Sequence, residues 1–118
     1  MYQKTQIIGR LGSDPEMRFT QDGTPVSSFS VATNKKWTVD GEKHEQVCWF
    51  RVSAWRKLAE TCNQYLKKGR QVFIEGELEP DESGGPRVWI DNENNPRAGY
   101  ELTARNVQFL GSRNEEEA

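Results

Sequence analysis

The sequence has 118 residues, which is one domain's worth, and its 34% hydrophobic content allows only a modest core. The formal net charge of −2 excludes a chain that is basic throughout, so any basic surface must be local. No apolar run is long enough to cross a membrane, and the residues after Met1 do not have the pattern of a signal peptide. We therefore expect a cytoplasmic protein without a membrane partner.

The residue types that carry catalysis or bind metals are sparse. The chain has two cysteines, Cys48 and Cys62, and one histidine, His44, and they lack the close spacing of a zinc site. The carboxylates are scattered over loops, and no phosphate-binding glycine motif is present. We expect no catalytic residue, no metal and no cofactor. An enzyme is the alternative with the least support.

The first third of the chain predicts short strands that are separated by tight turns. Asp22-Gly23 and Asp40-Gly41 are pairs that supply the positive φ of hairpin turns. Gly9 is typical of a close backbone approach at a barrel corner. The expected strands are residues 4–11, a short extended piece at 16–20, and residues 26–33.

The stretch from Glu45 to Lys57 predicts a long strand with two unlike faces, because neighbouring side chains on a strand point in opposite directions. It contains no Gly or Pro and is rich in β-branched and aromatic residues. The face that suits a core consists of Cys48, Phe50, Val52 and Ala54. The opposite face consists of Val47, Trp49, Arg51, Ser53, Trp55 and Lys57.

Indoles that alternate with cations on an exposed face fit a single strand of nucleic acid, which has flat bases and a charged backbone. Lys35, Lys36 and Trp37 precede the second hairpin turn and add to the same neighbourhood. A tryptophan on a strand is also commonly part of a core or an interface. Burial of Arg51 and Lys57 without partners would be costly, which argues against that interpretation. The strand by itself leaves both interpretations open.

The remaining sequence predicts one helix and two further strands. Helical spacing covers residues 56–68, whereas residues 71–78 and 100–110 have strand character. Residues 79–99 predict a long polar β-hairpin arm. The order of three strands, one helix and two strands predicts an all-β fold. This fold is the five-stranded antiparallel OB-fold barrel, with its helix between strands three and four and with extended hairpin arms.

We expect residues 1–111 to form this domain and residues 112–118 to form a short, acidic, disordered tail. Phe73 is the apolar residue on an otherwise polar strand face. A partly exposed aromatic residue on a sheet is common, but Phe73 is also a candidate contact between subunits.

Five segments in order cover nearly the whole of residues 4–111: IIGRLGSDPEMRFT, SFSVATNKKW, EQVCWFRVSAWRKLAE, YLKKGRQVFIEGEL and ELTARNVQFLG. Through them the chain resembles the bacterial single-stranded DNA-binding protein (SSB) family. The resemblance implies an OB-fold subunit that assembles into a homotetramer. It also implies sequence-independent binding of single-stranded DNA during replication, recombination and repair, at the nucleoid.

The resemblance further implies individual site residues. Bases would stack on Trp37, Trp49 and Trp55, and approximately on Trp89 in the hairpin arm. The family usually has Phe where this chain has Trp55, and the replacement preserves an aromatic face. The implied phosphate partners are Lys4, Arg18, Arg51, Lys57 and Lys68. Lys35 and Lys36 join them because they lie on the Trp37 arm.

Two departures from the family keep an alternative open. Glu79, Asp81 and Glu82 stand where the family has basic residues at the base of the hairpin. The family typically ends in an acidic tip that closes with Ile-Pro-Phe and recruits replication and repair proteins. This sequence ends in Glu117-Ala118, as a short paralogue or a trimmed chain, so we do not expect recruitment by that route. The alternative is an OB-fold primosomal or protein-interaction module with weak DNA binding.

Overall fold

The computed structural model describes residues 1–111. The predicted tail at 112–118 lies outside the described residues. The described part contains the helix α1 (Lys57–Tyr65) and strands β1 (Thr5–Leu11), β2 (Glu16–Phe19), β3 (Pro25–Val39), β4 (Glu42–Trp55), β5 (Gln71–Leu78), β6 (Val88–Ile90), β7 (Pro96–Ala98) and β8 (Tyr100–Phe109).

The main sheet closes into a barrel, as the sequence predicted. Its strand order is β1-β5-β8-β4-β3-β2, and pairing of β1 with β3 joins the two sides. The barrel strands are β1, β3, β4, β5 and β8, and α1 lies between the third and fourth of these in the chain. One neighbouring pair, β4 with β8, is parallel, whereas the other barrel pairs are antiparallel. β8 is parallel to β4 because it enters the sheet beside Phe50 after the long excursion through β6 and β7.

The barrel interior holds the apolar side chains of alternating strand positions. The buried cluster includes Ile7, Leu11, Phe29, Val31, Val52, Ala54, Cys62, Leu66, Val72, Ile74, Leu102 and Ala104. The helix packs against β3 and β4 and buries Ala59 and Cys62. Burial raises the pKa of the Cys62 thiol to about 11, so this side chain is a protonated, apolar part of the core.

Two glycines allow the strands to bend where the barrel closes. A Cβ atom on Gly9 would overlap the carbonyl oxygen of Ala32, and one on Gly76 would overlap that of Thr103. The register of β5 against β8 also shifts between Glu75 and Gly76, which is a β-bulge. The predicted role of Gly9 at a site of close backbone approach is confirmed, and Gly76 has the same role.

The hairpin of β3 and β4 is longer than expected. Its ladder extends from Val26 opposite Trp55 to Val39 opposite Glu42, whereas the sequence predicted strands at 26–33 and 45–57. The polar arm residues continue the antiparallel pairing up to the turn. The predicted strand end at Lys57 was wrong, because β4 ends at Trp55. Arg56 adopts a φ of 60°, and Lys57 begins the helix.

The helix is shorter than the predicted 56–68. It ends at Tyr65, and Leu66 takes an extended conformation that lets its side chain enter the core. Gly69, with a φ of +89°, lies in the following turn instead of directly at the helix end. The segment 79–99 also differs from one long hairpin, because β6 and β7 form a short sheet of their own.

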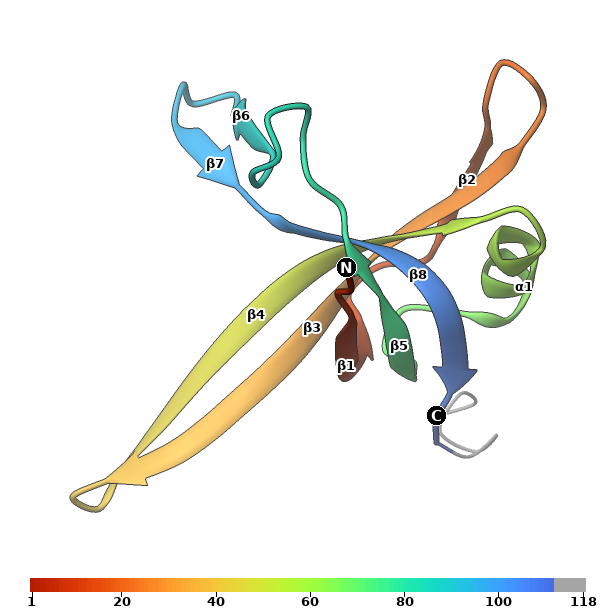
Figure 1. Cartoon of the computed structure of the whole chain (residues 1–118). Coiled ribbons are helices and arrows are strands. Elements are labelled where there is room, and N and C mark those ends of the chain that lie inside the picture. The colour runs from red at the N-terminus through yellow and green to blue at the C-terminus, as the bar shows by residue number, and fades with distance from the viewer. Residues whose placement is uncertain (112–118) are drawn as a thin grey trace.

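Two arms extend from the barrel (Figure 1). The β3–β4 hairpin projects from one side, and the small β6–β7 sheet stands on another side, above the strands that close the barrel. The principal extents are 56 × 41 × 37 Å, so the molecule is elongated by its arms. Within residues 1–111, α1 is too short and polar to cross a membrane.

Candidate nucleic-acid interface

The outer face of the β3–β4 sheet carries the predicted row of tryptophan and arginine. Trp49, Arg51 and Trp55 lie on this face of β4 and are exposed, whereas Val52 and Ala54 on the other face are fully buried. The exposed fractions are 53% for Trp49 and 41% for Trp55. The alternation predicted from the sequence is therefore confirmed, and both rings are about half exposed.

The neighbours of Trp49 on β3 are small. Its partner on β3 is Ala32, and the next residue on that face is Ser30. A Cβ atom on Gly12 would lie 2.5 Å from Cζ3 of the indole, so the ring rests on the bare backbone of Gly12. The sequence does not indicate this role of Gly12, because it depends on the placement of a residue on another strand.

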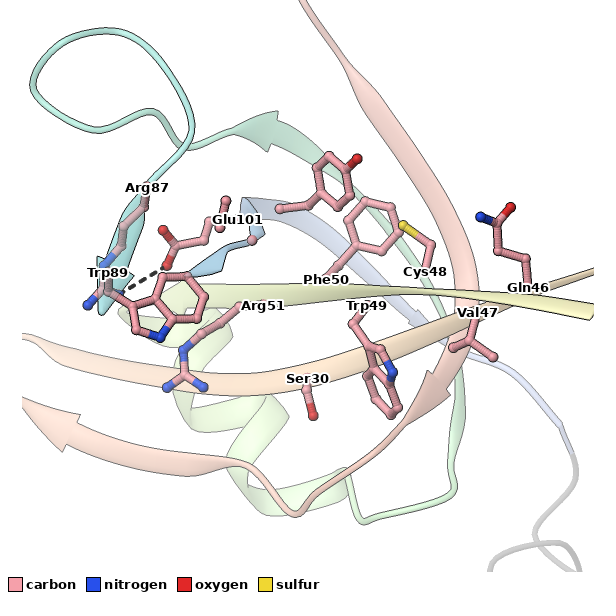
Figure 2. A pocket seen from close by; sticks show the side chains of 13 residues that line it. Ser30, Gln46, Val47, Cys48, Trp49, Phe50, Arg51, Arg87, Trp89 and Glu101 are labelled. Atoms are coloured by element: carbon pink, nitrogen blue, oxygen red, sulfur yellow. Dashed lines mark ion pairs between the residues drawn. The ribbon is translucent and has the colours of Figure 1, made fainter. Parts of the chain in front are cut away.

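A groove of about 740 Å³ runs between β4 and the β6–β7 arm. Trp49 and Arg51 line it from β4, and Trp89 lines it from β6 (Figure 2). In the same view, Phe50 and Cys48 project from the opposite side of β4. The structure thus brings Trp89 to the same groove as Trp49, as the family resemblance implied only approximately.

Arg87 is a groove residue that the sequence analysis did not identify. Its guanidinium carbon lies 5.7 Å from the centre of the Trp89 ring, and its Nη1 lies 3.6 Å from Oε1 of Glu101. Glu101 is also the register partner of Arg51. Arg51 itself has no ion pair within residues 1–111, so its charge is available to a phosphate, whereas Arg87 would have to exchange its carboxylate partner for one.

Trp37 lies on the β3–β4 arm, at a different place from Trp49. It stacks on His44, with ring centroids 5.5 Å apart, and Nζ of Lys35 lies 5.8 Å from its centre. Strand alternation places Trp37 and Trp49 on opposite faces of the hairpin, and Trp37 lines a separate cavity of about 450 Å³. Trp37 and Trp49, which we expected in one neighbourhood, therefore lie on opposite faces of one hairpin. Lys36 shares the Trp49 face.

Arg18 and Lys57 lie near Trp55. The register aligns Arg18 of β2 with Val26 of β3, and Val26 with Trp55 of β4, so the three side chains form one row across the sheet. Lys57 follows two residues after Trp55, and its Nζ lies 3.9 Å from Oε2 of Glu60. This ion pair is largely exposed and leaves the ammonium open to solvent.

Lys4 and Lys68 lie outside the groove. Nζ of Lys4 lies 3.5 Å from Oε1 of Glu75 in β5, beside the N-terminus. A hydrogen bond from Gln6 and the nearby charge of Lys4 hold the pKa of Glu75 below its usual value. Lys68 lies in the turn after the helix, where its backbone N–H donates to Oδ1 of Asp14 at 2.8 Å. The structure does not bring these two lysines together with Trp49.

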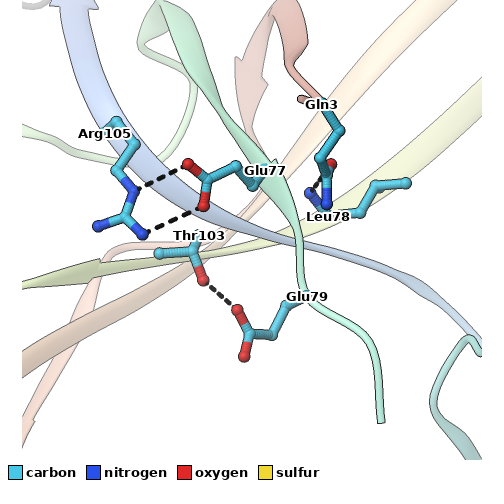
Figure 3. A network of polar contacts seen from close by, with 6 residues as sticks. All are labelled: Gln3, Glu77, Leu78, Glu79, Thr103 and Arg105. Atoms are coloured by element: carbon cyan, nitrogen blue, oxygen red, sulfur yellow. Dashed lines mark hydrogen bonds and ion pairs between the residues drawn. The ribbon is translucent and has the colours of Figure 1, made fainter. Parts of the chain in front are cut away.

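The carboxylates at the base of the β6–β7 arm have partners within the fold (Figure 3). The guanidinium of Arg105 donates two hydrogen bonds to Glu77, and the hydroxyl of Thr103 donates to Glu79. Asp81 accepts hydrogen bonds from Ser83 in the turn that follows, and the hydroxyl of Ser83 lowers its pKa. These acidic residues therefore stabilise the base of the arm.

The side chains that could bind a metal are not clustered. Among residues 1–111, no group of three or more His, Cys, Asp or Glu side chains is arranged to hold a metal ion. The chemistry that the site offers is stacking on exposed indoles and charge pairing with arginine and lysine.

Comparison with known proteins gives a consistent result. A sequence model of the "Single-strand binding protein family" matches residues 2–110. The chain is 42% identical over 112 residues to a protein of Xylella fastidiosa named "Single-stranded DNA-binding protein 1" and covers 78% of its length. It is 39% identical to the "Single-stranded DNA-binding protein" of Neisseria meningitidis, of which it covers 62%. In both alignments more than nine-tenths of this chain takes part.

A solved structure agrees with the sequence comparison. The chain is similar to a structure titled "Plasmodium falciparum SSB complex with ssDNA", with a TM-score of 0.75 and 27% sequence identity. The match covers 94% of this chain and 97% of the other.

A further relative in sequence, "Single-stranded DNA-binding protein 1" of Chlorobaculum tepidum, is 41% identical, and the chain spans 65% of its length.

Proposed function

Because the chain belongs to the single-strand binding protein family, we propose that it binds single-stranded DNA without sequence specificity and protects it. The observation that carries this proposal is the pairing of an exposed Trp49 with an Arg51 that has no ion pair in the described chain. A stacking ring and an available cation side by side in a groove suit a base and its phosphate.

Two physical effects, base stacking and phosphate neutralisation, contribute to the binding free energy. Each base that stacks on Trp49, Trp55 or Trp89 contributes roughly 1–3 kcal/mol, and every base has an aromatic face, so sequence preference is weak. Arginines and lysines neutralise phosphates and release counterions, which makes the affinity depend on salt. Duplex DNA keeps its bases stacked on one another, so single strands bind better. Trp37 provides a further stacking ring on the other face of the hairpin.

The phosphate contacts fall into two groups by position. Those nearest the tryptophans are Arg51, Arg18, Lys57, Lys35 and Lys36. Lys4 and Lys68 lie farther away and would contact DNA only if the strand wraps around the barrel. Binding without catalysis is the proposed mode of action, with no cofactor in any step.

Assembly into a homotetramer is part of the proposal. Ile8 is 56% exposed on the outer face of β1, and its register partner Phe73 is partly buried on β5. For residues 5–8, pairing of β1 within the described chain is with β5 only, so the other edge can accept a further strand. An oligomer that binds one DNA strand at several sites gains affinity because later contacts are intramolecular.

The proposed setting is DNA replication, recombination and repair, at the nucleoid. Residues 1–111 would form the binding domain. Any recruitment of replication or repair proteins through the tail concerns residues outside the described part. The alternative, a primosomal or protein-interaction module, shares the fold and differs in having weak DNA binding.

Titration with oligo(dT), followed by tryptophan fluorescence, separates single-strand DNA binding from the alternative of a module with weak DNA binding. We expect strong quenching, and we expect Trp49→Ala to lower the affinity about tenfold for each subunit that contacts the strand, because each of these subunits loses one stacked base. Trp55→Ala should do the same. The matched control is Tyr65→Ala, which removes an exposed aromatic residue from the helix. Unchanged fluorescence of the unmutated chain at low salt would contradict single-strand binding and favour the alternative.

A further inference from the structure

Arg56 has a backbone conformation that its side chain does not favour. Its φ is 60° and its ψ is −126°, a region that is populated almost only by glycine. Asp40 and Asn94 are the other residues in the described chain that have positive φ without being glycine. Both lie in hairpin turns, and Asp and Asn accept this conformation readily. Arg56 does not lie in a hairpin turn, and arginine is not a residue type that accepts this conformation readily.

The fold uses the backbone of Arg56 but not its side chain. The N–H of Arg56 donates to the carbonyl of Pro25 at 2.9 Å, and its carbonyl accepts from the N–H of Glu60 at 3.2 Å. These bonds turn the chain from β4 into α1, and a glycine would make them with less strain. The side chain is exposed and makes no ion pair or hydrogen bond with residues 1–111. Folding therefore does not account for an arginine here.

The surroundings of Arg56 do account for it. It follows Trp55 directly, and Pro25, which its N–H contacts, is the register partner of Phe19 at the end of β2. Arg18 lies next to Phe19, in the row that includes Trp55. Trp55 thus lies in one row with Arg18, across Val26 of β3, and is followed by Arg56 at the strand end. This arrangement forms a second cluster of cations and an aromatic ring, six residues along β4 from Trp49.

We propose that Arg56 binds a DNA phosphate next to the base that stacks on Trp55, and that the chain accepts backbone strain at this position for that contact. This inference rests on the proposed function. It adds a phosphate ligand and explains a conformation that the fold alone does not require. Strain of this kind is found at functional sites when the surrounding structure holds it in place.

The test compares Arg56→Gly, Arg56→Ala and Arg56→Lys in the full chain. Glycine removes both the charge and the strain, alanine removes only the charge, and lysine keeps both. We expect the slope of log affinity for oligo(dT) against log salt to fall in magnitude by about 0.7 for each subunit that contacts the strand in the glycine and alanine variants. It should remain unchanged in the lysine variant. We also expect the thermal midpoint of the glycine variant to exceed that of the alanine variant by about 3–8 °C.

The outcomes separate this inference from the proposed function. If the unmutated chain binds oligo(dT) and all three variants keep its salt slope, Arg56 is not a phosphate ligand and the inference is overturned. If the glycine variant is no more stable than the alanine variant, the strain argument is overturned. If the unmutated chain does not bind oligo(dT) at all, the proposed function fails first, and the inference fails with it.

Discussion

Trp49 depends on its small neighbours for its position above the sheet. A larger residue than Ala32 or Ser30 on β3 would cover part of the indole, and a side chain on Gly12 would collide with it. The ring therefore rests on backbone on one side and faces the groove on the other. This packing holds the indole ready for a base, so less side-chain entropy is lost on binding.

Gly12→Ala tests this arrangement. The new methyl group would lie 2.5 Å from the ring atom Cζ3, so the indole must move. We expect affinity for oligo(dT) to fall about five- to tenfold, with little change in the thermal midpoint. The same substitution in a Trp49→Ala background should have almost no further effect, because the ring that it displaces is absent.

Gly85→Ala provides the matched control for that experiment. A Cβ atom on Gly85 meets only Ser83 Oγ, at 3.8 Å, which is an ordinary contact. This variant should bind oligo(dT) as the unmutated chain does. Equal binding by Gly12→Ala and Gly85→Ala would show that the position of the Trp49 ring does not matter for affinity.

At the scale of single residues, the sequence predicted what strand alternation determines. The exposed row of Trp49, Arg51 and Trp55 follows from the period of two. The contact of Arg87 with Glu101 could not be predicted in this way, because it joins residues on separate strands whose placement depends on the whole fold. The effect of Gly12 on Trp49 is hidden for the same reason.

At the scale of elements, pairing decided the boundaries that pattern alone could not. Residues 34–36 of the arm are polar and give no strand signal, yet the pairing continues through them to Val39 because β4 lies beside them. The helix stops early because Leu66 is drawn into the core, although its residue type would continue a helix. Both differences come from tertiary contacts that override local preference.

The outer face of β1 and β5 bears on assembly. Ile8 and Phe73 are register partners on a face that is otherwise polar, with Gln6 and Glu75 as the next pair along the ladder. We expect the unmutated chain to sediment as a tetramer and the double variant Ile8→Glu, Phe73→Glu to sediment as a smaller species, because four carboxylates or more would meet in a buried contact.

Val39→Glu is the control for assembly, since Val39 is 49% exposed at the end of the β3–β4 arm and far in sequence from β1. It should leave the sedimentation coefficient unchanged. A monomeric unmutated chain would contradict the proposed tetramer, whatever the variants do.

At the scale of the whole molecule, the groove joins parts of the chain that are distant in sequence. β4 supplies Trp49 and Arg51, β6 supplies Trp89, and β8 supplies Glu101. The barrel holds β4 rigidly, whereas the β6–β7 sheet is small and pairs only with itself in the described chain. A two-stranded sheet has little stability of its own, so we infer that this wall of the groove adjusts to the strand that it binds.

The central claim is that bases stack on the exposed tryptophans while cations hold the phosphates. The most direct measurement compares the affinity of the full chain for oligo(dT), for an abasic strand of equal length and charge, and for a duplex, at one salt concentration. Stacking predicts that oligo(dT) binds at least tenfold more tightly than either competitor. Equal affinity for the oligo(dT) and abasic strands would show that only phosphates are bound and would contradict the account.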